Sequence, residues 1–222
     1  LACKFCAFRR GRRSPDAYAM DITEYIEDLR NYAEHVDEVH SVGGLHPEWD
    51  VNHYSKLFSA VKKEFPSIHV KALTAVEIKH IANLSNMSIK DTLKTLHDSG
   101  LDSLPGGGAE ILDDEVRKTL CPDKVNTEQW LHVMETAHSI GIPSTATIMY
   151  GHIEQTKHWA RHLLRVKKLQ QKTGGFTEFV PLPFVHMEAP IYLKGRARKG
   201  PTYREAILMH SVSRLVLHPD IK

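Results

Sequence analysis

The feature that most constrains the fold of this chain is an alternation of short apolar segments with longer amphipathic ones. The apolar segments are rich in β-branched residues, as is typical of buried strands. The amphipathic segments place apolar side chains three and four residues apart, which is the spacing of one helix face. We predict strands over 36–42, 68–73, 101–104, 143–150 and 176–182, and helices over 21–34, 52–64, 88–99, 126–140, 155–172 and 202–217.

This order of elements predicts an α/β fold with parallel strands joined by right-handed crossovers. Both an open doubly wound sheet and a (β/α) barrel fit the order. Glycines or polar side chains follow several strands, at 43–44, 105–110, 150–154 and 181–186. A barrel gathers all its strand ends at one mouth, whereas a doubly wound sheet uses only its switch point. We therefore predict a partial TIM-like (β/α) barrel that lacks its first strand, because no strand precedes the first helix.

Composition narrows the class of protein. The chain has 222 residues, of which 41% are hydrophobic and 25% charged, and we expect one domain over residues 1–222. A net charge of +2 predicts no nucleic-acid partner, and no apolar run is long enough to predict a membrane span. Three cysteines do not form a disulfide framework, so a reducing, cytoplasmic setting is expected. The chain opens without Met and stops just after a helical pattern, which indicates a fragment truncated at both ends.

The chain opens on Cys3-Lys4-Phe5-Cys6, a CxxC pair. Thiolates two residues apart can bind one metal centre, because a tight loop turns both sulfurs inward. Taken alone, the pair fits half a zinc site, a redox pair or an iron–sulfur site. A zinc site needs a second pair, and Cys121 is the only other cysteine. A redox pair is typical of a smaller fold, so cluster ligation by Cys3 and Cys6 is favoured.

Other strand ends carry candidate binding residues. Gly43-Gly44 suits either a close approach to a ligand or a plain turn. The segment 105–110 is rich in glycine but lacks the Lys-Ser/Thr that follows a phosphate-binding loop, and its Glu110 can accept hydrogen bonds from ribose hydroxyls. His186, after the last strand, is either a substrate contact or a surface residue.

Several polar residues receive a structural interpretation. His158 and His162 lie four residues apart on a predicted helix, a spacing that can bind a metal ion. Without a neighbouring acidic base we expect them on the solvated face of the helix. Cys121 is expected to be a small residue that is buried or half-buried. The arginines near the CxxC pair are expected to be solvated charges: Arg9, Arg10, Arg12 and Arg13.

Together these motifs resemble the radical S-adenosylmethionine (SAM) superfamily, whose CxxxCxxC motif carries an aromatic residue before its last cysteine. Phe5 is that aromatic, and Cys3 and Cys6 resemble the second and third ligands. The first ligand would lie just before Leu1, so we expect the chain as given to lack one ligand and to be inactive by itself. The resemblance implies a [4Fe–4S] cluster that cleaves SAM to methionine and a 5′-deoxyadenosyl radical.

The resemblance also implies contacts to SAM. Gly43-Gly44 resembles the diglycine motif that holds the SAM amino group. The stretch 146–154 resembles the superfamily's GxIxGxxE motif near the adenine, although Thr147 replaces the first glycine. The implied cofactor-binding residues are Phe5, Gly43, Gly44, Glu110, Met149, Gly151 and Glu154.

Longer segments narrow the resemblance within the superfamily. Segments 100–110 and 150–154 look like a group that contains the tyrosine-using FO synthase family (CofH) and two menaquinone-pathway enzymes, aminofutalosine synthase and dehypoxanthine futalosine cyclase. Segment 174–192 looks most like the FO synthase family, whereas 71–78 is closer to aminofutalosine synthase. We give more weight to 174–192, because a strand end at a barrel mouth faces substrate.

The FO synthase resemblance implies a transferase that joins the 4-hydroxybenzyl group of tyrosine to 5-amino-6-(D-ribitylamino)uracil. It also implies a partner FO synthase subunit or domain that closes the deazaflavin ring. Candidate substrate-binding residues are His46, Lys71, Glu178 and His186, and no catalytic residue is assigned. A menaquinone-pathway radical SAM enzyme is the alternative. A non-catalytic metal- or cluster-binding protein is the alternative from another class.

Overall fold

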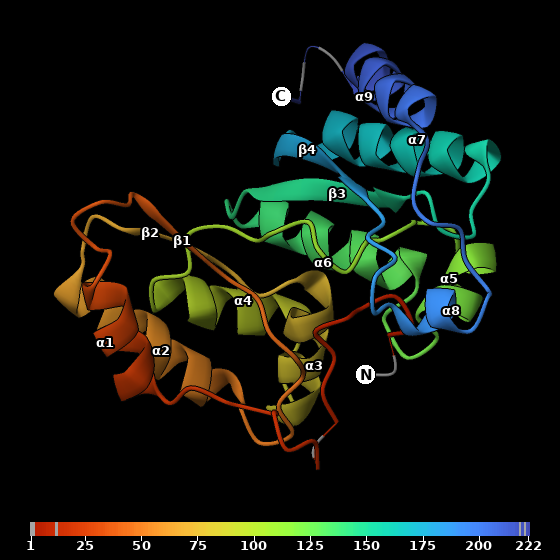
Figure 1. Ribbon diagram of the computed structural model, residues 1–222. Coiled ribbons are helices and arrows are strands. Elements are labelled where there is room, and N and C mark those ends of the chain that lie inside the picture. Colours follow the sequence, from red (N-terminus) through yellow and green to blue (C-terminus); the bar gives the residue numbers. More distant parts are fainter. Residues whose placement is uncertain (1–2, 12, 218, 220) are drawn as a thin grey trace. The chain divides into compact units, whose positions relative to one another are not determined.

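The computed structural model describes residues 3–11, 13–217, 219 and 221–222. Its elements follow in the order α1 (Ile22–Arg30), β1 (Glu38–Ser41), α2 (Val51–Glu64), β2 (His69–Ala72), α3 (Ala75–Leu84), α4 (Ile89–Asp98), α5 (Asp114–Leu120), α6 (Thr127–Ser139), β3 (Ser144–Tyr150), α7 (Thr156–Thr173), β4 (Phe176–Pro183), α8 (Pro190–Leu193) and α9 (Tyr203–Leu217) (Figure 1). They form two compact units: unit 1 is Leu1–Arg9 with Gly106–Lys222, and unit 2 is Arg10–Pro105. A single domain over residues 1–222 stays a prediction, because each unit is described by itself.

Unit 2 contains a parallel pair of strands, with Glu38 of β1 opposite His69 of β2 and Ser41 opposite Ala72. The predicted strand over 101–104 is wrong: the structure forms no strand over these described residues, and Ser103 joins β2 through an isolated bridge to Lys71. The side chain of Asp102 is the reason. Its carboxylate accepts the N–H of Val70 at 2.7 Å, which replaces the backbone acceptor that a longer ladder would use.

Unit 1 contains the second parallel pair, in which β3 and β4 run side by side from Ser144 opposite Phe176 to Tyr150 opposite Pro183. The register is irregular between Ser144 and Thr145. Helices α6 and α7 pack against β3, and α9 packs against β4 and α7 (Figure 1). Parallel strands connected through helices confirm the predicted α/β class.

The two prolines near the end of β4 lie within the strand. Pro181 is opposite Ile148 and Pro183 is opposite Tyr150. Neighbouring donors explain this. Phe184 donates to Tyr150 of β3 at 2.8 Å, whereas the N–H of Phe179 points away from β3 to Lys222. Prolines at the odd-numbered positions therefore remove no donor that β3 needs.

The prediction from periodicity missed α3, α5 and α8. Helix α3 buries the four consecutive residues 75–78, which cover every side of its first turn, so burial there does not follow a single face. Helices α5 and α8 have seven and four residues, which is too short for a periodic signal. The long helices begin and end within a few residues of their predicted positions, because each carries a local pattern of its own.

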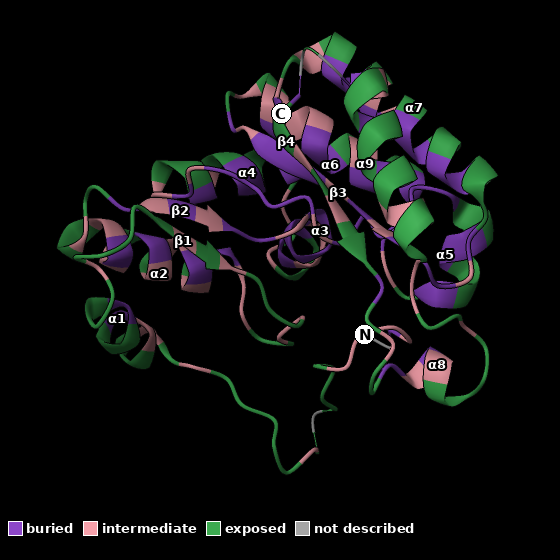
Figure 2. Cartoon of the chain, turned by 45° about the horizontal axis from the view of Figure 1, so that its top comes forward, coloured by how far each residue is buried: buried purple, intermediate pink, exposed green. Residues whose placement is uncertain are grey.

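Helix α7 has one buried and one exposed side (Figure 2). The prediction for His158 and His162 was wrong, because both lie on the buried side at 4% and 0% exposure. Their spacing places them on the same face as Trp159 and Val166, which packs into the core of unit 1. Each imidazole Nδ1 accepts a backbone N–H, from Gln155 to His158 at 2.9 Å and from Leu112 to His162 at 3.0 Å.

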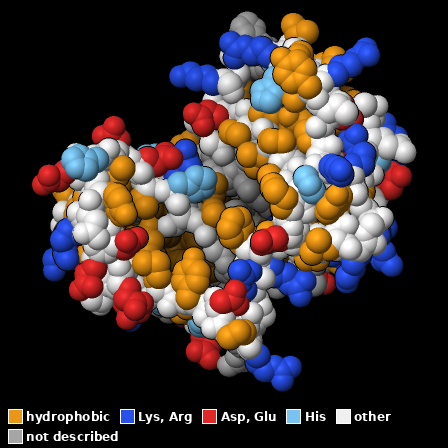
Figure 3. All heavy atoms as spheres, in the orientation of Figure 1, with side chains coloured by type: hydrophobic (Ala, Val, Ile, Leu, Met, Phe, Trp, Pro, Cys, Tyr) orange, Lys and Arg blue, Asp and Glu red, His pale blue; other side chains and the backbone are white. Residues whose placement is uncertain are grey.

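The surface is mixed in character. On the face shown in Figure 3, side chains of both charges lie among hydrophobic ones. Helix α9 exposes large apolar residues, including Tyr203 and Leu215. None of the helices that the structure describes is long and apolar enough to span a membrane.

Candidate functional site

The CxxC loop is held at both of its sides by backbone hydrogen bonds within unit 1. The N–H of Lys4 donates to Leu120 at the end of α5 at 3.2 Å, and its carbonyl accepts from Ile191 of α8 at 2.8 Å. Cys3 is 7% exposed, Cys6 is half-buried, and both are free thiols. The loop therefore presents two unpaired sulfurs from a backbone that the rest of the unit anchors.

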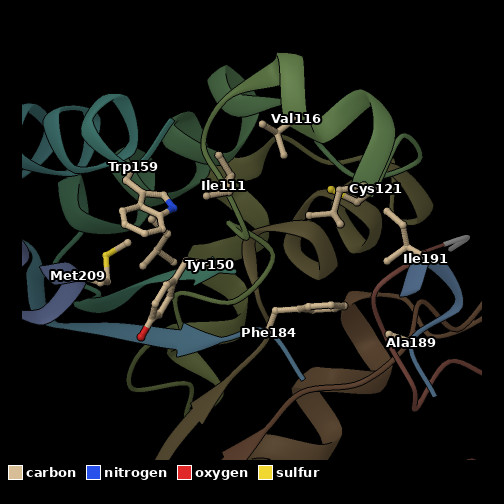
Figure 4. Close-up of a cluster of buried hydrophobic side chains, with 11 residues drawn as sticks. Ile111, Val116, Cys121, Tyr150, Trp159, Phe184, Ala189, Ile191 and Met209 are labelled. Atoms are coloured by element: carbon tan, nitrogen blue, oxygen red, sulfur yellow. The ribbon is translucent and has the colours of Figure 1, made fainter. Parts of the chain in front are cut away.

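Phe5 fixes the inner side of this loop. Its ring packs against a cluster of buried hydrophobic residues, in which Phe184 points toward Ala189 and Ile191 while Tyr150 meets Trp159 edge to face (Figure 4). Cys121 belongs to the same cluster and is 2% exposed, which confirms that it is a buried core residue. Burial raises the pKa of Cys121 to about 12, so it stays a protonated thiol.

A buried ion pair lies beside the loop. Lys124 Nζ is 2.8 Å from Glu110 Oε1 and 5.1 Å from the centre of the Phe5 ring. Burial opposes the charge on Lys124, but Glu110 and the nearby thiols of Cys3 and Cys121 together outweigh it and raise the pKa of the ammonium. Burial raises the pKa of Cys3, and among the neighbouring charges Lys124 lowers it more than Glu110 raises it. The site thus holds a cation whose field reaches the first thiol of the pair.

The glycine-rich segment before Glu110 is packed tightly onto β3. The N–H of Gly106 donates to Thr145 Oγ1 at 2.8 Å, and Thr147 Oγ1 donates to the Gly106 carbonyl at 2.7 Å. A Cβ on Gly106 would lie 2.6 Å from the Cα of Ala146, so only glycine fits here. Thr147, which replaces the first glycine of the superfamily motif, therefore binds this loop through its hydroxyl.

Arg117 binds the same loop through its side chain, and no sequence pattern predicted this role. Its buried guanidinium donates to four carbonyl oxygens, those of Gly108 at 3.1 Å, Ile111 at 3.2 Å, Val125 at 2.5 Å and Ala109. In the sequence, Arg117 is an ordinary arginine seven residues after Glu110, and nothing in its neighbours predicts that it is buried. The guanidinium replaces the backbone partners that a glycine-rich loop otherwise lacks.

Glu110 leaves one polar atom without a hydrogen bond. The residue has φ +42 and is 7% exposed. Its Oε1 binds Lys124, but its buried Oε2 has no hydrogen-bond partner among the described residues, and Arg117 Nη1 is 3.9 Å away. Its carbonyl accepts the N–H of Met149 at 2.8 Å, which joins this loop to the end of β3. An orphaned buried acceptor is costly, and a ligand hydroxyl would satisfy it.

The turn after β3 is built around Glu154. Its carboxylate accepts the N–H groups of Gly151 at 2.5 Å and His152 at 2.8 Å, and Trp159 Nε1 at 3.0 Å. Gly151 has φ +95, and a Cβ there would lie 2.2 Å from the nitrogen of Pro201. Burial lowers the pKa of His152, so a neutral ring donates from Nε2 to the Met149 carbonyl at 3.0 Å. Glu154 therefore shapes the turn, and its carboxylate is occupied by donors of the turn and of α7.

In unit 2, the diglycine segment is tied to the start of α3. The N–H of Gly43 donates to Glu77 Oε1 at 3.0 Å, while Glu77 Oε2 accepts from the N–H of Thr74 at 2.8 Å. Gly44 is exposed. His46 is half-buried and stacks on Trp49, with ring centres 4.3 Å apart.

The other candidate substrate residues have separate surroundings. Lys71 of β2 pairs with Glu38 of β1 at 2.9 Å. Glu178 is exposed on β4. His186 is half-buried against Tyr192, with ring centres 4.6 Å apart. The structure brings Cys3, Cys6, Phe5, Glu110, Met149, Gly151, Glu154, Glu178 and His186 into unit 1, and Gly43, Gly44, His46 and Lys71 into unit 2.

Comparison with known proteins decides the family. The model of the radical SAM superfamily matches residues 1–166, which include the CxxC loop and the turn at Glu154. The chain belongs to the radical SAM superfamily. Members of this superfamily use a [4Fe–4S] cluster and SAM.

Curated relatives resemble this radical SAM chain along its whole length. A protein of Methanopyrus kandleri named 5-amino-6-(D-ribitylamino)uracil–L-tyrosine 4-hydroxyphenyl transferase is 45% identical over 99% of the chain and 60% of its own length. A protein of the same name from Methanocaldococcus jannaschii is 42% identical over 99% of the chain and 62% of its own length. The FO synthase of Mycobacterium tuberculosis is 44% identical over 99% of the chain and 26% of its own length. The chain thus spans about three fifths of the transferases that it matches.

Solved structures confirm the radical SAM fold. Methylornithine synthase (PylB) matches 97% of the chain and 58% of its own length with a TM-score of 0.72 at 16% identity. Coproporphyrinogen III oxidase (HemN) of Escherichia coli matches 98% of the chain and 50% of its own length with a TM-score of 0.63 at 15% identity. The predicted partial barrel is thereby confirmed.

The residues present fit the cofactors of the superfamily. The free thiols of Cys3 and Cys6 are soft donors that suit iron, and an anchored loop carries both. The orphaned Oε2 of Glu110 fits a hydroxyl donor such as those of the SAM ribose. Both groups lie in unit 1.

Proposed function

We propose that the protein carrying this chain is a radical SAM transferase that joins the 4-hydroxybenzyl group of tyrosine to 5-amino-6-(D-ribitylamino)uracil in deazaflavin (FO) biosynthesis. The observation that carries the proposal is 45% identity, over 99% of the chain, to a relative named for this reaction. A second relative of the same name and the FO synthases support it at similar identity. A menaquinone-pathway activity has only segment 71–78 in its favour.

Cys3 and Cys6 would hold two irons of the [4Fe–4S] cluster, with a third ligand before Leu1 as the motif implies. When cluster and SAM are bound, they supply the radical that starts the reaction. Phe5 holds the loop against the buried hydrophobic cluster, which keeps water from the inner side of the thiolates. Cys121 is left out of the ligand set, because it is a core residue that stays protonated.

SAM would be held mainly by backbone groups and by Glu110. Since the N–H of Gly43 is occupied by Glu77, the diglycine segment offers carbonyl oxygens to the SAM amino group. Glu110 Oε2 would accept a ribose hydroxyl. Met149 and the turn that Gly151 and Glu154 form would offer the adenine a backbone edge beside β3.

His46, Lys71, Glu178 and His186 are proposed to bind the polar parts of tyrosine and of the ribityl uracil. His186 and His46 each have an aromatic neighbour that orients the imidazole. A partner FO synthase subunit or domain would close the ring, as the single-chain FO synthases suggest by their length. The free cysteines favour a reducing, cytoplasmic setting.

The test uses the natural polypeptide that contains this chain, reconstituted anaerobically with iron and sulfide. With SAM and dithionite it should release 5′-deoxyadenosine, and with tyrosine and the ribityl uracil it should form their adduct. A cluster-loaded protein that leaves SAM intact would contradict the radical SAM activity. If no adduct forms and the protein turns over a futalosine-pathway substrate instead, the menaquinone alternative is favoured.

Matched cysteine variants test the ligand assignment. Cys3→Ser and Cys6→Ser should each lose most of the bound iron, because each removes one thiolate ligand. Cys121→Ser should keep its iron. Equal iron loss in all three variants would show that Cys121 also binds, or that the losses come from misfolding.

A further inference from the structure

Lys124 has no role in the proposed chemistry, yet it lies against the loop that carries the cysteines. It follows α5 in the chain, and its side chain is 12% exposed. Its ammonium is 2.8 Å from Glu110 Oε1 and 5.1 Å from the centre of the Phe5 ring. A lysine is rarely buried without a reason, because removing its charge from water is costly.

Stability alone does not account for this arrangement. A buried ion pair contributes little net stability, since the cost of desolvating both charges offsets their attraction. Apolar residues of similar volume would fill the same place in a hydrophobic cluster. The pair of Lys124 and Glu110 places a fixed positive charge over the ring of Phe5, between Cys3 and Cys6 in the chain. Apolar residues would not supply this charge.

The position of the charge sets its effect. Lys124 faces Phe5, which lies between the two cysteines in the chain, whereas its partner Glu110 lies in the loop that packs on β3. The fields of two opposite charges cancel only at distances that are large compared with their separation. Close to the CxxC loop, the nearer charge dominates, and a buried charge is screened little by solvent.

We propose that Lys124 is a positioning and electrostatic residue for the cluster, and that its positive charge stabilises the reduced, more negative state. The proposal rests on the proposed ligation by Cys3 and Cys6. Charges near an iron–sulfur cluster tune its reduction potential, because the reduced cluster carries one more electron. Glu110 holds the ammonium in place, and the Phe5 ring receives it by a cation–π contact.

The experiment measures the midpoint potential of the cluster by anaerobic titration in the holoprotein without SAM. Lys124→Gln removes the charge and keeps a hydrogen-bond donor for Glu110, so its potential should shift to more negative values. Lys124→Arg keeps the charge and should stay close to the wild-type potential. Lys168→Met, at an exposed lysine of α7, is the matched control and should not shift it.

A folding defect is separated from the electrostatic effect by two further measurements. Iron content and circular dichroism show whether each variant holds its cluster and its fold. If Lys124→Gln does not fold, the double variant Glu110→Gln and Lys124→Gln replaces the ion pair by a neutral, hydrogen-bonded pair. That variant should shift the potential in the same direction by a smaller amount, because both charges are gone.

Each outcome bears on one proposal. A wild-type protein that binds no iron, while Cys3→Ser changes nothing, would overturn the proposed ligation. A wild-type protein that holds its cluster, with an unchanged potential in the folded Lys124→Gln or double variant, would overturn the role of Lys124. A negative shift that Lys124→Arg restores would support it.

Discussion

At the scale of single residues, the site depends on polar groups that are buried and individually satisfied. The guanidinium of Arg117 donates to carbonyl oxygens, and the carboxylate of Glu154 accepts from N–H groups. Glu110 Oε2 is the exception among these residues. Because an unsatisfied buried acceptor is costly, this atom supports the proposal that Glu110 binds a ligand hydroxyl.

Gly151 allows a prediction about backbone strain. Its φ of +95 disfavours any side chain, and a Cβ would lie 2.2 Å from the nitrogen of Pro201. Gly141 has φ +86 but nothing within 4 Å of its Cβ position. Gly141→Ala should therefore lower the free energy of unfolding by about 1 kcal/mol, and Gly151→Ala by at least about 3 kcal/mol. Urea denaturation measures both, and equal losses would show that the contact with Pro201 does not matter.

His162 allows a prediction about pH. Burial lowers its pKa from 6.5 to about 3 in the folded chain. Below about pH 6.5 the unfolded chain therefore binds a proton at His162 that the folded chain does not bind. The free energy of unfolding is unaffected by His162 above about pH 6.5, and it falls as the pH falls toward 3. Between about pH 6.5 and 5 the loss should be about 2 kcal/mol, at about 1.4 kcal/mol per unit.

The His162→Gln variant should lose about 2 kcal/mol less than wild type over this interval. Its amide oxygen can still accept the N–H of Leu112, as the imidazole does. The exposed His210 provides the control for the substitution itself, and His210→Gln should change the free energy of unfolding at pH 7 by less than about 0.5 kcal/mol. An identical slope in wild type and His162→Gln, by urea denaturation at several pH values, would contradict the assignment.

At the scale of elements, capping residues define where several helices begin. Asp21, Thr74 and Asn126 each accept the backbone N–H of the third helical residue, whose side chain bonds back to the cap. Such reciprocal caps satisfy donors that the first turn leaves free. Sequence patterns show these starts well, because cap and partner are only three residues apart.

Asn126 is suited to a test of this effect, because its cap lies at the surface. Asn126→Ala should lower the free energy of unfolding by about 1 kcal/mol, since it leaves the N–H of Gln129 without its partner. Asn126→Ser should recover most of this loss because serine also caps. Thermal denaturation compares the three proteins, and an equal loss in both variants would contradict a capping role.

At the scale of the whole molecule, the chain passes between its two compact units at two places that differ in burial. Around Arg9 and Arg10 the side chains are exposed and the backbone is in neither helix nor strand. Around Pro105 and Gly106 the residues are buried. We therefore expect the two crossings to differ in their susceptibility to proteases.

Limited trypsin digestion should cut first after Arg9, Arg10 or Arg13, because a protease needs an exposed segment that can enter its active site. Exposed lysines inside helices, such as Lys90 of α4 and Lys168 of α7, should be cut later. Mass spectrometry of the earliest fragments identifies the cuts. First cuts at the helical lysines would contradict the described boundary.

The sequence by itself determined the α/β class, the parallel strands, most of the helices and the CxxC loop. These features are encoded in residues close together in the chain, whose spacing reports which face of an element is apolar. The radical SAM resemblance followed from such local motifs, and the comparisons confirmed it. The predicted contacts to SAM and substrate remain predictions.

Only the tertiary structure decided which polar side chains are buried and what satisfies them. Periodicity places His158 and His162 on one face, but it does not say that this face packs into the core. It likewise does not join Lys124 to Glu110 and Phe5, which are far apart in the chain. Desolvation and pairing depend on neighbours that the fold brings together, and this is why the charge beside the CxxC loop is visible only in the folded molecule.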